Sequence, residues 1–266
     1  MNIFSDFNDK LVDRIPLGAI FIITLIIILI CLRTGSVFGR KRKKALMVDS
    51  DSPINNVVGA TLGLLALMLA FTFGLTIERF SERKAMLLEE VNIISTVYLR
   101  SDFLSEPYKH QIQELLKRYV SIRSNLSKES VELSRQIIES EKIQEEIWYL
   151  TSKYVQGSSN VMLNALFVES LNQMIDQHEK RKVVALAYRV PIGVWTVIIV
   201  LFIISMWSMG FQFGYVGHYS YYVSFIVAIA FASVVMLIAD IDRPFEGLVT
   251  VNQVPFIELN EKLIKD

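Results

Sequence analysis

Four long apolar stretches set the hydrophobic pattern of this chain. They cover residues 15–32, 54–77, 190–207 and 220–239, and none of them contains Asp, Glu, Lys or Arg. A helix needs roughly 20 apolar residues to cross the hydrocarbon core of a bilayer. The pattern therefore predicts an all-α, polytopic membrane protein with four transmembrane helices.

The second apolar stretch runs without a break into a charged segment. Neither Gly nor Pro occurs between Ile77 and Leu104, so one continuous helix is expected from Pro53 to Leu104. One face of this helix carries small residues in its apolar part and mostly polar residues beyond it. The small residues are Gly59, Gly63, Ala66, Ala70 and Gly74, and the face continues through Glu78, Glu82, Ala85, Glu89, Asn92, Thr96 and Arg100.

The charged region after this stretch also has a helical pattern. Its apolar positions recur at helical spacing, and three helices are predicted, with a start at Pro107, a joint at 124–127 and a break at 156–160. These helices form an extramembrane helical domain inserted between the second and third spans.

The chain divides into four predicted parts. They are the first membrane helix pair (1–77), the extramembrane helical domain (78–187), the second membrane helix pair (188–239) and a charged C-terminal tail (240–266). The first pair is joined by a basic loop at 33–55, and the second pair by a glycine-rich hairpin at 209–219. The tail ends in a short amphipathic segment that contains Phe256, Leu259 and Leu263.

The basic loop predicts the orientation in the membrane. Its six Lys and Arg residues outnumber its two Asp residues, so the positive-inside rule places it in the cytoplasm. The helical domain and both termini, including the polar segment 1–14, are then extracytoplasmic. The basic run 40–44, with no cleavage site after the first apolar stretch, favours a retained span over a signal peptide. Contact of this run with anionic lipid is favoured over nucleic-acid binding.

The sequence contains no recognisable catalytic or cofactor-binding motif. GxSxG, HExxH, CxxC and a phosphate-binding glycine loop are all missing, which disfavours an enzyme. The single Cys31 and the three widely separated histidines predict no metal site. His178 is expected to be a solvated helix residue near the membrane. Trp148 and the tyrosines of the helical domain are expected to be core residues.

The small-residue face of the second span allows two interpretations. It can line a pore, with Phe73 and Ile77 forming a constriction, or it can pack against another helix. The charges near the two mouths of such a pore favour ions of opposite sign. The amino-terminal end of the span and the basic run 40–44 favour anions, whereas acidic residues at the other end favour cations. Those residues, Glu78, Glu82 and Glu89, can instead form an ordinary solvated face paired with Arg79, Arg83 and Lys84.

A charged cluster lies at the end of the fourth span. Asp240, Asp242 and Arg243 precede Pro244, where the helix is expected to stop. They can form a structural network with Arg79 or Arg100, or a binding site.

Four segments together resemble the bestrophin-like domain family of bacterial membrane proteins. They are GLLALMLAFTF (63–73), Glu78-Arg79, EEVNIISTVYLR (89–100) and DIDRPFEG (240–247). Val91 departs from the Glu-Ala-Asn of the family's middle motif. The resemblance covers roughly residues 55–250. It implies a bacterial inner-membrane protein related to bestrophins, which are pentameric anion channels with four spans per subunit and a helical extramembrane part.

Two features of bestrophins do not carry over to this sequence. Their acidic calcium clasp has no counterpart here. Their helical domain lies in the cytosol, whereas the basic loop at 33–55 places this one outside.

Two functions from different classes follow. The first is a homo-oligomeric ion channel, pentameric if it follows the bestrophins, with the second span around the pore. It conducts inorganic ions, and anions are favoured over cations. The second is a membrane-anchored scaffold or sensor whose helical domain binds a partner without conduction.

Overall fold

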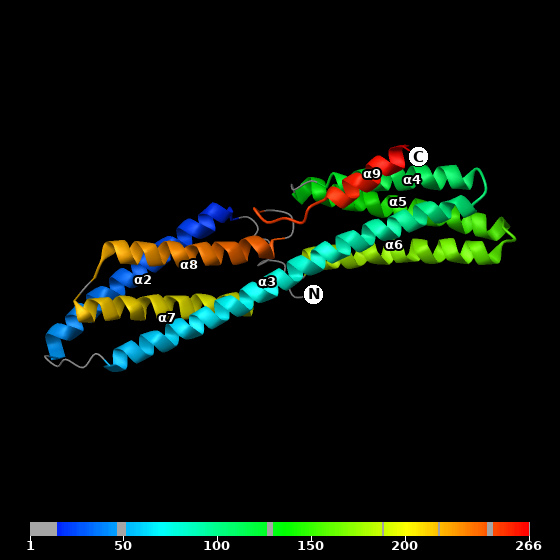
Figure 1. Cartoon of the computed structure of the whole chain (residues 1–266). Helices are drawn as coiled ribbons and strands as arrows, with labels where there is room; N and C mark the ends of the chain where they lie inside the picture. The colour runs from blue at the N-terminus through cyan, green and yellow to red at the C-terminus, as the bar shows by residue number, and fades with distance from the viewer. Residues whose placement is uncertain are drawn as a thin grey trace. The chain divides into compact units, whose positions relative to one another are not determined.

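The computed structural model describes residues 15–46, 52–126, 130–187, 189–217, 219–243 and 247–265. The predictions for segment 1–14, Ser127, His218 and Pro244 lie outside these ranges. Every regular element within them is helical (Figure 1). The elements are α2 (Leu17–Leu46), α3 (Ser52–Arg100), the short 3-10 helix η1 (Ser101–Phe103), α4 (Tyr108–Ser124), α5 (Ser130–Gly157), α6 (Val161–Ala187), α7 (Ile192–Val216), α8 (Tyr221–Asp242) and α9 (Val254–Lys265).

The predicted fold class is confirmed. Helices α2, α3, α7 and α8 are long and apolar enough to cross a membrane, and α4, α5 and α6 lie between the second and third of them in sequence. The 49 residues of α3 make a helix about 75 Å long. Its apolar part, residues 54–77, is sufficient to cross a bilayer, so the charged remainder lies beyond the membrane-spanning segment.

Two predicted connecting segments are shorter than expected, because part of each is helical. The basic loop at 33–55 is helical as far as Leu46, because Arg and Lys are good helix formers and no proline interrupts the run. The glycine-rich segment at 209–219 is helical as far as Val216, and the chain turns only at Gly217, whose φ is +96°. The glycines inside α7 serve a packing role instead.

The chain forms two compact units. The membrane unit consists of the described residues in 15–79, 189–243 and 247–249, and the helical unit of those in 80–187 and 250–265. Helix α3 therefore contributes residues to both. The C-terminal segment does not form a separate tail, because α9 buries its apolar side chains in the helical unit.

Close backbone contact between α2 and α7 organises the membrane unit. A Cβ atom added to Gly210 would lie 2.7 Å from Leu32 Cα, and one added to Gly214 would lie 2.7 Å from Ser36 Cα. Gly35 and Gly39 meet the α7 backbone equally closely from the other side. Small residues allow such approach, which is how helices in lipid gain van der Waals contact. An apolar cluster from α2, α3, α7 and α8 completes this unit.

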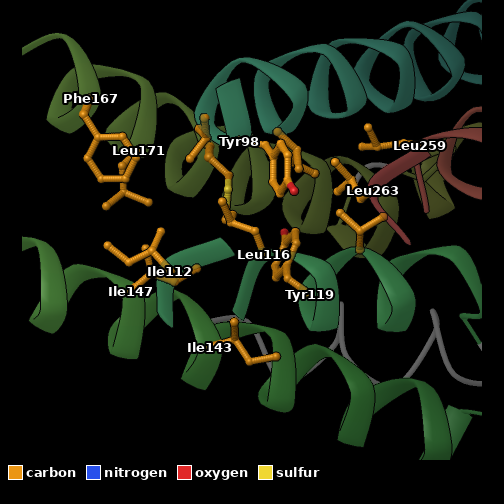
Figure 2. Close-up of a cluster of buried hydrophobic side chains, with 14 of the residues drawn as sticks. Tyr98, Ile112, Leu116, Tyr119, Ile143, Ile147, Phe167, Leu171, Leu259 and Leu263 are labelled. Carbon is orange, nitrogen blue, oxygen red and sulfur yellow. The ribbon is translucent and has the colours of Figure 1, made fainter. Parts of the chain in front are cut away.

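Buried side chains from five helices form the core of the helical unit. Helices α4 and α5 contribute Leu116 and Ile147, and α6 contributes Phe167 and Leu171, all fully buried (Figure 2). Helices α3 and α9 add Ile94 and Phe256. The predicted helices of this domain are confirmed, and the buried side chains named here form a common core.

An ionised carboxylate lies inside this core. Glu90 of α3 is completely buried, and its oxygens lie 3.1 Å from an Arg123 guanidinium nitrogen and 2.5 Å from one of Arg181. The hydroxyl of Tyr119 donates to the same carboxylate over 3.1 Å. Both guanidinium groups also lie over the ring of Phe256, 5.9 Å and 5.2 Å from its centroid. The cluster thereby joins α3 to α4, α6 and α9.

At Glu90, ion pairing affects the pKa of the carboxyl more than burial does. Burial alone would raise the pKa of this carboxyl, but attraction to Arg123 and Arg181 and the hydrogen bonds that they donate lower the pKa from 4.5 to about 2. The side chain is therefore ionised at neutral pH.

Enlarging Gly210 is expected to destabilise the membrane unit. The variant Gly210→Ala places a methyl group against the α2 backbone, and overpacking of this kind costs about 1–3 kcal/mol. Thermal unfolding of the protein in detergent measures the effect. Gly193→Ala in the same helix is the control, because a Cβ there meets no atom of the described residues within 4 Å. Equal melting temperatures for the two variants would contradict the packing role.

Replacing Glu90 by Gln is expected to cost about 3–5 kcal/mol of unfolding free energy, because two arginines lose their buried counter-charge. Denaturant unfolding of the protein in detergent, followed by circular dichroism, measures this difference. The exposed neighbour Glu89 supplies the control variant Glu89→Gln, which should stay within about 0.5 kcal/mol of the wild type.

Lowering the pH should reduce the difference in unfolding free energy between the wild type and Glu90→Gln. The folded-state pKa of Glu90 is lowered, so its contribution to stability is complete above about pH 4.5 and is lost as the pH falls toward 2. If this free-energy difference stays constant as the pH falls, the charge of the carboxylate is not the source of its contribution to stability.

Candidate pore-lining face

Helix α3 buries one face and leaves the opposite face uncovered in the membrane unit. Leu65 and Leu69 are buried in the apolar cluster. The five predicted small residues, Gly59, Gly63, Ala66, Ala70 and Gly74, are all exposed in the single chain. A Cβ added to any of the three glycines would meet no atom of the described residues within 4 Å. Within one chain, this small-residue face therefore has no packing partner in the part that the structure describes.

The two residues of the predicted constriction have different surroundings. Ile77 is 41% exposed, whereas Phe73 is half-buried and packs against the apolar cluster of the membrane unit. Ile77 is thus the more accessible of the two large side chains beside the small-residue face.

The charged continuation of this face is exposed only in part. Glu78, Glu82, Glu89 and Asn92 are exposed. Arg79 is half-buried, and Arg100 donates a hydrogen bond of 2.7 Å to the backbone carbonyl of Leu166 in α6. The accessible groups of this part of α3 are therefore mainly acidic and polar.

The charged cluster at the end of α8 binds backbone groups. The two oxygens of Asp240 accept hydrogen bonds from the N–H groups of Leu248 and Val249, at 2.8 Å and 3.1 Å. Gly247 has a φ of +132°, and a Cβ there would lie 3.1 Å from Asp240 Cγ. The glycine that ends the DIDRPFEG segment thus allows the chain to turn against this carboxylate.

The neighbouring charges make similar contacts. Asp242 accepts a hydrogen bond of 3.1 Å from the backbone N–H of Val190, at the start of the third span. Arg243 donates one of 2.6 Å to the carbonyl of Ile15, before the first span. Asp242 and Arg243 therefore join chain segments that lie far apart in sequence, whereas Asp240 holds the segment that follows α8.

Sequence reasoning missed Glu90 and misjudged three residues of the helical unit. Glu90 lies three residues after Leu87 and four before Ile94, both buried, and a charge on that apolar stripe was the available signal. The prediction that His178 is solvated is wrong, since the residue is 1% exposed. The prediction of core positions is also wrong for Trp148 and Tyr149, which are 40% and 56% exposed.

Three solved structures share the fold of this chain. A crystal structure of a bacterial bestrophin homolog from Klebsiella pneumoniae, in mutant form, has a TM-score of 0.66 and 14% identity, and the match covers 92% of this chain and 98% of that one. A second structure with that description has a TM-score of 0.65 and 14% identity, covering 92% and 97%. A structure described as a membrane protein mutant has a TM-score of 0.67 and 13% identity, with the same coverage as the second.

No curated protein matches the sequence significantly. The profile of the bestrophin-like domain matches residues 26–256, which is most of the chain and includes part of the first span and all of the second, third and fourth spans. On this match, together with the shared fold, the chain belongs to the bestrophin-like domain family.

Proposed function

We propose that this protein is an oligomeric ion channel in which α3 lines the pore. The observation that carries the proposal is the uncovered small-residue face of α3, opposite a face that is buried within the chain. Several copies around an axis would bring these faces together. Gly59, Gly63, Ala66, Ala70 and Gly74 would then leave room for ions, because their side chains are small.

Ile77 and Phe73 would narrow such a pore beside Gly74. Apolar constrictions can gate a channel by dewetting, and this gate needs no ionisable residue in the span. Ile77 would be the main contributor, because it is the more exposed of the two in the single chain.

Anions are the proposed permeant ions. The basic run 40–44 lies in the last turns of α2, and the amino-terminal end of α3, which carries a partial positive charge, begins at Ser52. Both would favour anions at this mouth. Glu78, Glu82 and Glu89 at the other end oppose this selectivity, so chloride and sodium fluxes must be measured side by side.

A scaffold or sensor remains the second candidate. The observation in its favour is an open pocket of about 560 Å³ between α5 and α6 in the helical unit. Its lining mixes charged and apolar groups, including Trp148, Asn172 and Ile175. A partner could bind there without any conduction.

A bulky side chain on the small-residue face should block conduction. We expect Gly63→Phe and Ala70→Phe to reduce chloride flux into liposomes at least tenfold, since an aromatic ring would fill the axis. Ile226→Phe is the control, because it also enlarges an exposed side chain of a span, on α8.

Native mass measurement of the same variants separates the two roles of this face. Blocked flux with an intact oligomer supports the pore. Loss of the oligomer in both variants would assign the face to packing between subunits. A wild-type protein that is monomeric and passes neither chloride nor sodium would contradict the channel proposal.

The basic run 40–44 supports an orientation with the helical unit and both termini outside the cytoplasm, in the inner membrane of a bacterium. An alkaline phosphatase fused after Asp266 is then expected to be active, because this enzyme requires an extracytoplasmic environment. Activity of a cytoplasmic-type reporter fused at the same position would reverse the orientation.

A further inference from the structure

Three potential metal ligands meet between α5 and α6 in the helical unit. Glu141 of α5 and the adjacent His178 and Glu179 of α6 each offer a ligand atom, and these atoms lie within 4.8 Å of one another. Local sequence spacing does not reveal this group, because Glu141 precedes the other two residues by 37 and 38 positions.

The buried hydrogen bonds define which nitrogen of His178 is available. The single hydroxyl proton of Tyr119 goes to Glu90, which is ionised and can only accept. The Tyr119 oxygen must therefore accept from His178 Nδ1, 2.9 Å away, as it also does from Gln144 Nε2 at 3.2 Å. His178 thus carries its proton on Nδ1, and Nε2 holds a lone pair.

That lone pair has no hydrogen-bond partner among the described residues, although Nε2 is fully buried. A neutral imidazole whose other nitrogen donates a hydrogen bond is the usual form of a metal-bound histidine. An orphaned buried acceptor is also costly, and a metal ion would satisfy it.

A cation already occupies the space between the two carboxylates. The ammonium nitrogen of Lys182 lies 2.7 Å from a Glu141 oxygen and 2.6 Å from a Glu179 oxygen. This arrangement directs both carboxylates toward one point. An ammonium group cannot bind Nε2 as a metal does, because it offers no empty orbital to the lone pair.

We propose that Glu141, His178 and Glu179 form a binding site for a divalent transition-metal ion of the zinc class, with Lys182 as its built-in competitor. One imidazole nitrogen and two carboxylate oxygens suit zinc, whereas calcium and magnesium prefer oxygen ligands alone. An open pocket is lined by both glutamates and Lys182, so the carboxylate side of the group is accessible.

The site is linked to α3 by an unbroken chain of contacts. His178 donates to Tyr119, and Tyr119 donates to Glu90. A metal on Nε2 would therefore act on the carboxylate that fixes α3 in the helical unit.

Zinc binding to the full-length, tag-free protein in detergent tests the proposal, by equilibrium dialysis with metal analysis. The wild type is expected to bind one zinc ion per chain. Glu141→Gln and Glu179→Gln should each weaken binding at least tenfold, and Lys182→Met should tighten it, because the competing ammonium group is removed. Glu145→Gln is the matched control, since Glu145 lines the same pocket outside the ligand group. Excess calcium or magnesium should not displace the zinc.

X-ray absorption of the zinc-loaded Lys182→Met protein identifies the ligands without a histidine substitution that could disturb folding. One imidazole in the first shell is expected. The proposal is overturned if neither the wild type nor Lys182→Met binds stoichiometric zinc, if Glu145→Gln weakens binding as much as Glu141→Gln, or if the bound zinc has no imidazole ligand. These measurements do not depend on conduction, so they stand apart from the channel test.

Discussion

The burial of one carboxylate constrains the helical unit more than any other single interaction. Glu90 is removed from water, so its charge has to be matched within the protein, and Arg123, Arg181 and Tyr119 do so from two other helices. Because all three partners approach from one side of α3, the rotation of that helix about its own axis is fixed within the unit. Glu89 and Asn92 are consequently exposed.

A different kind of contact fixes the membrane unit. Helices α2 and α7 meet through glycine backbones, which leaves no space for adjustment by side chains. Helix α3 joins this pair through apolar side chains such as Leu65. In addition, Ser205 of α7 donates a hydrogen bond of 3.0 Å to the backbone carbonyl of Thr61 in α3. In each unit, the packing of α3 therefore accounts for one face and leaves another exposed in the single chain.

The sequence was sufficient to predict most of the helices and their order. Strong periodic patterns predicted α3 as one continuous helix and α4, α5 and α6 as separate ones, because these patterns depend on local spacing. The prediction of a hairpin at 209–219 was wrong because a glycine can indicate either a turn or a close contact between helices. Only the position of α2 distinguishes these two roles. Local spacing also cannot show which distant residues meet. Glu90 with Arg181, and Glu141 with His178, come together only through packing of α3, α5 and α6.

The glycines of this protein impose unequal limits on sequence change. Gly35, Gly39, Gly210 and Gly214 touch backbone, so even alanine requires the helices to separate. Gly59, Gly63 and Gly74 face open space in the single chain, where alanine or serine fits without any movement. Among homologous chains, the first set should therefore tolerate no replacement, whereas the second should drift among small residues. A position that drifts in this way but never becomes large would identify a passage that the assembled protein has to keep open.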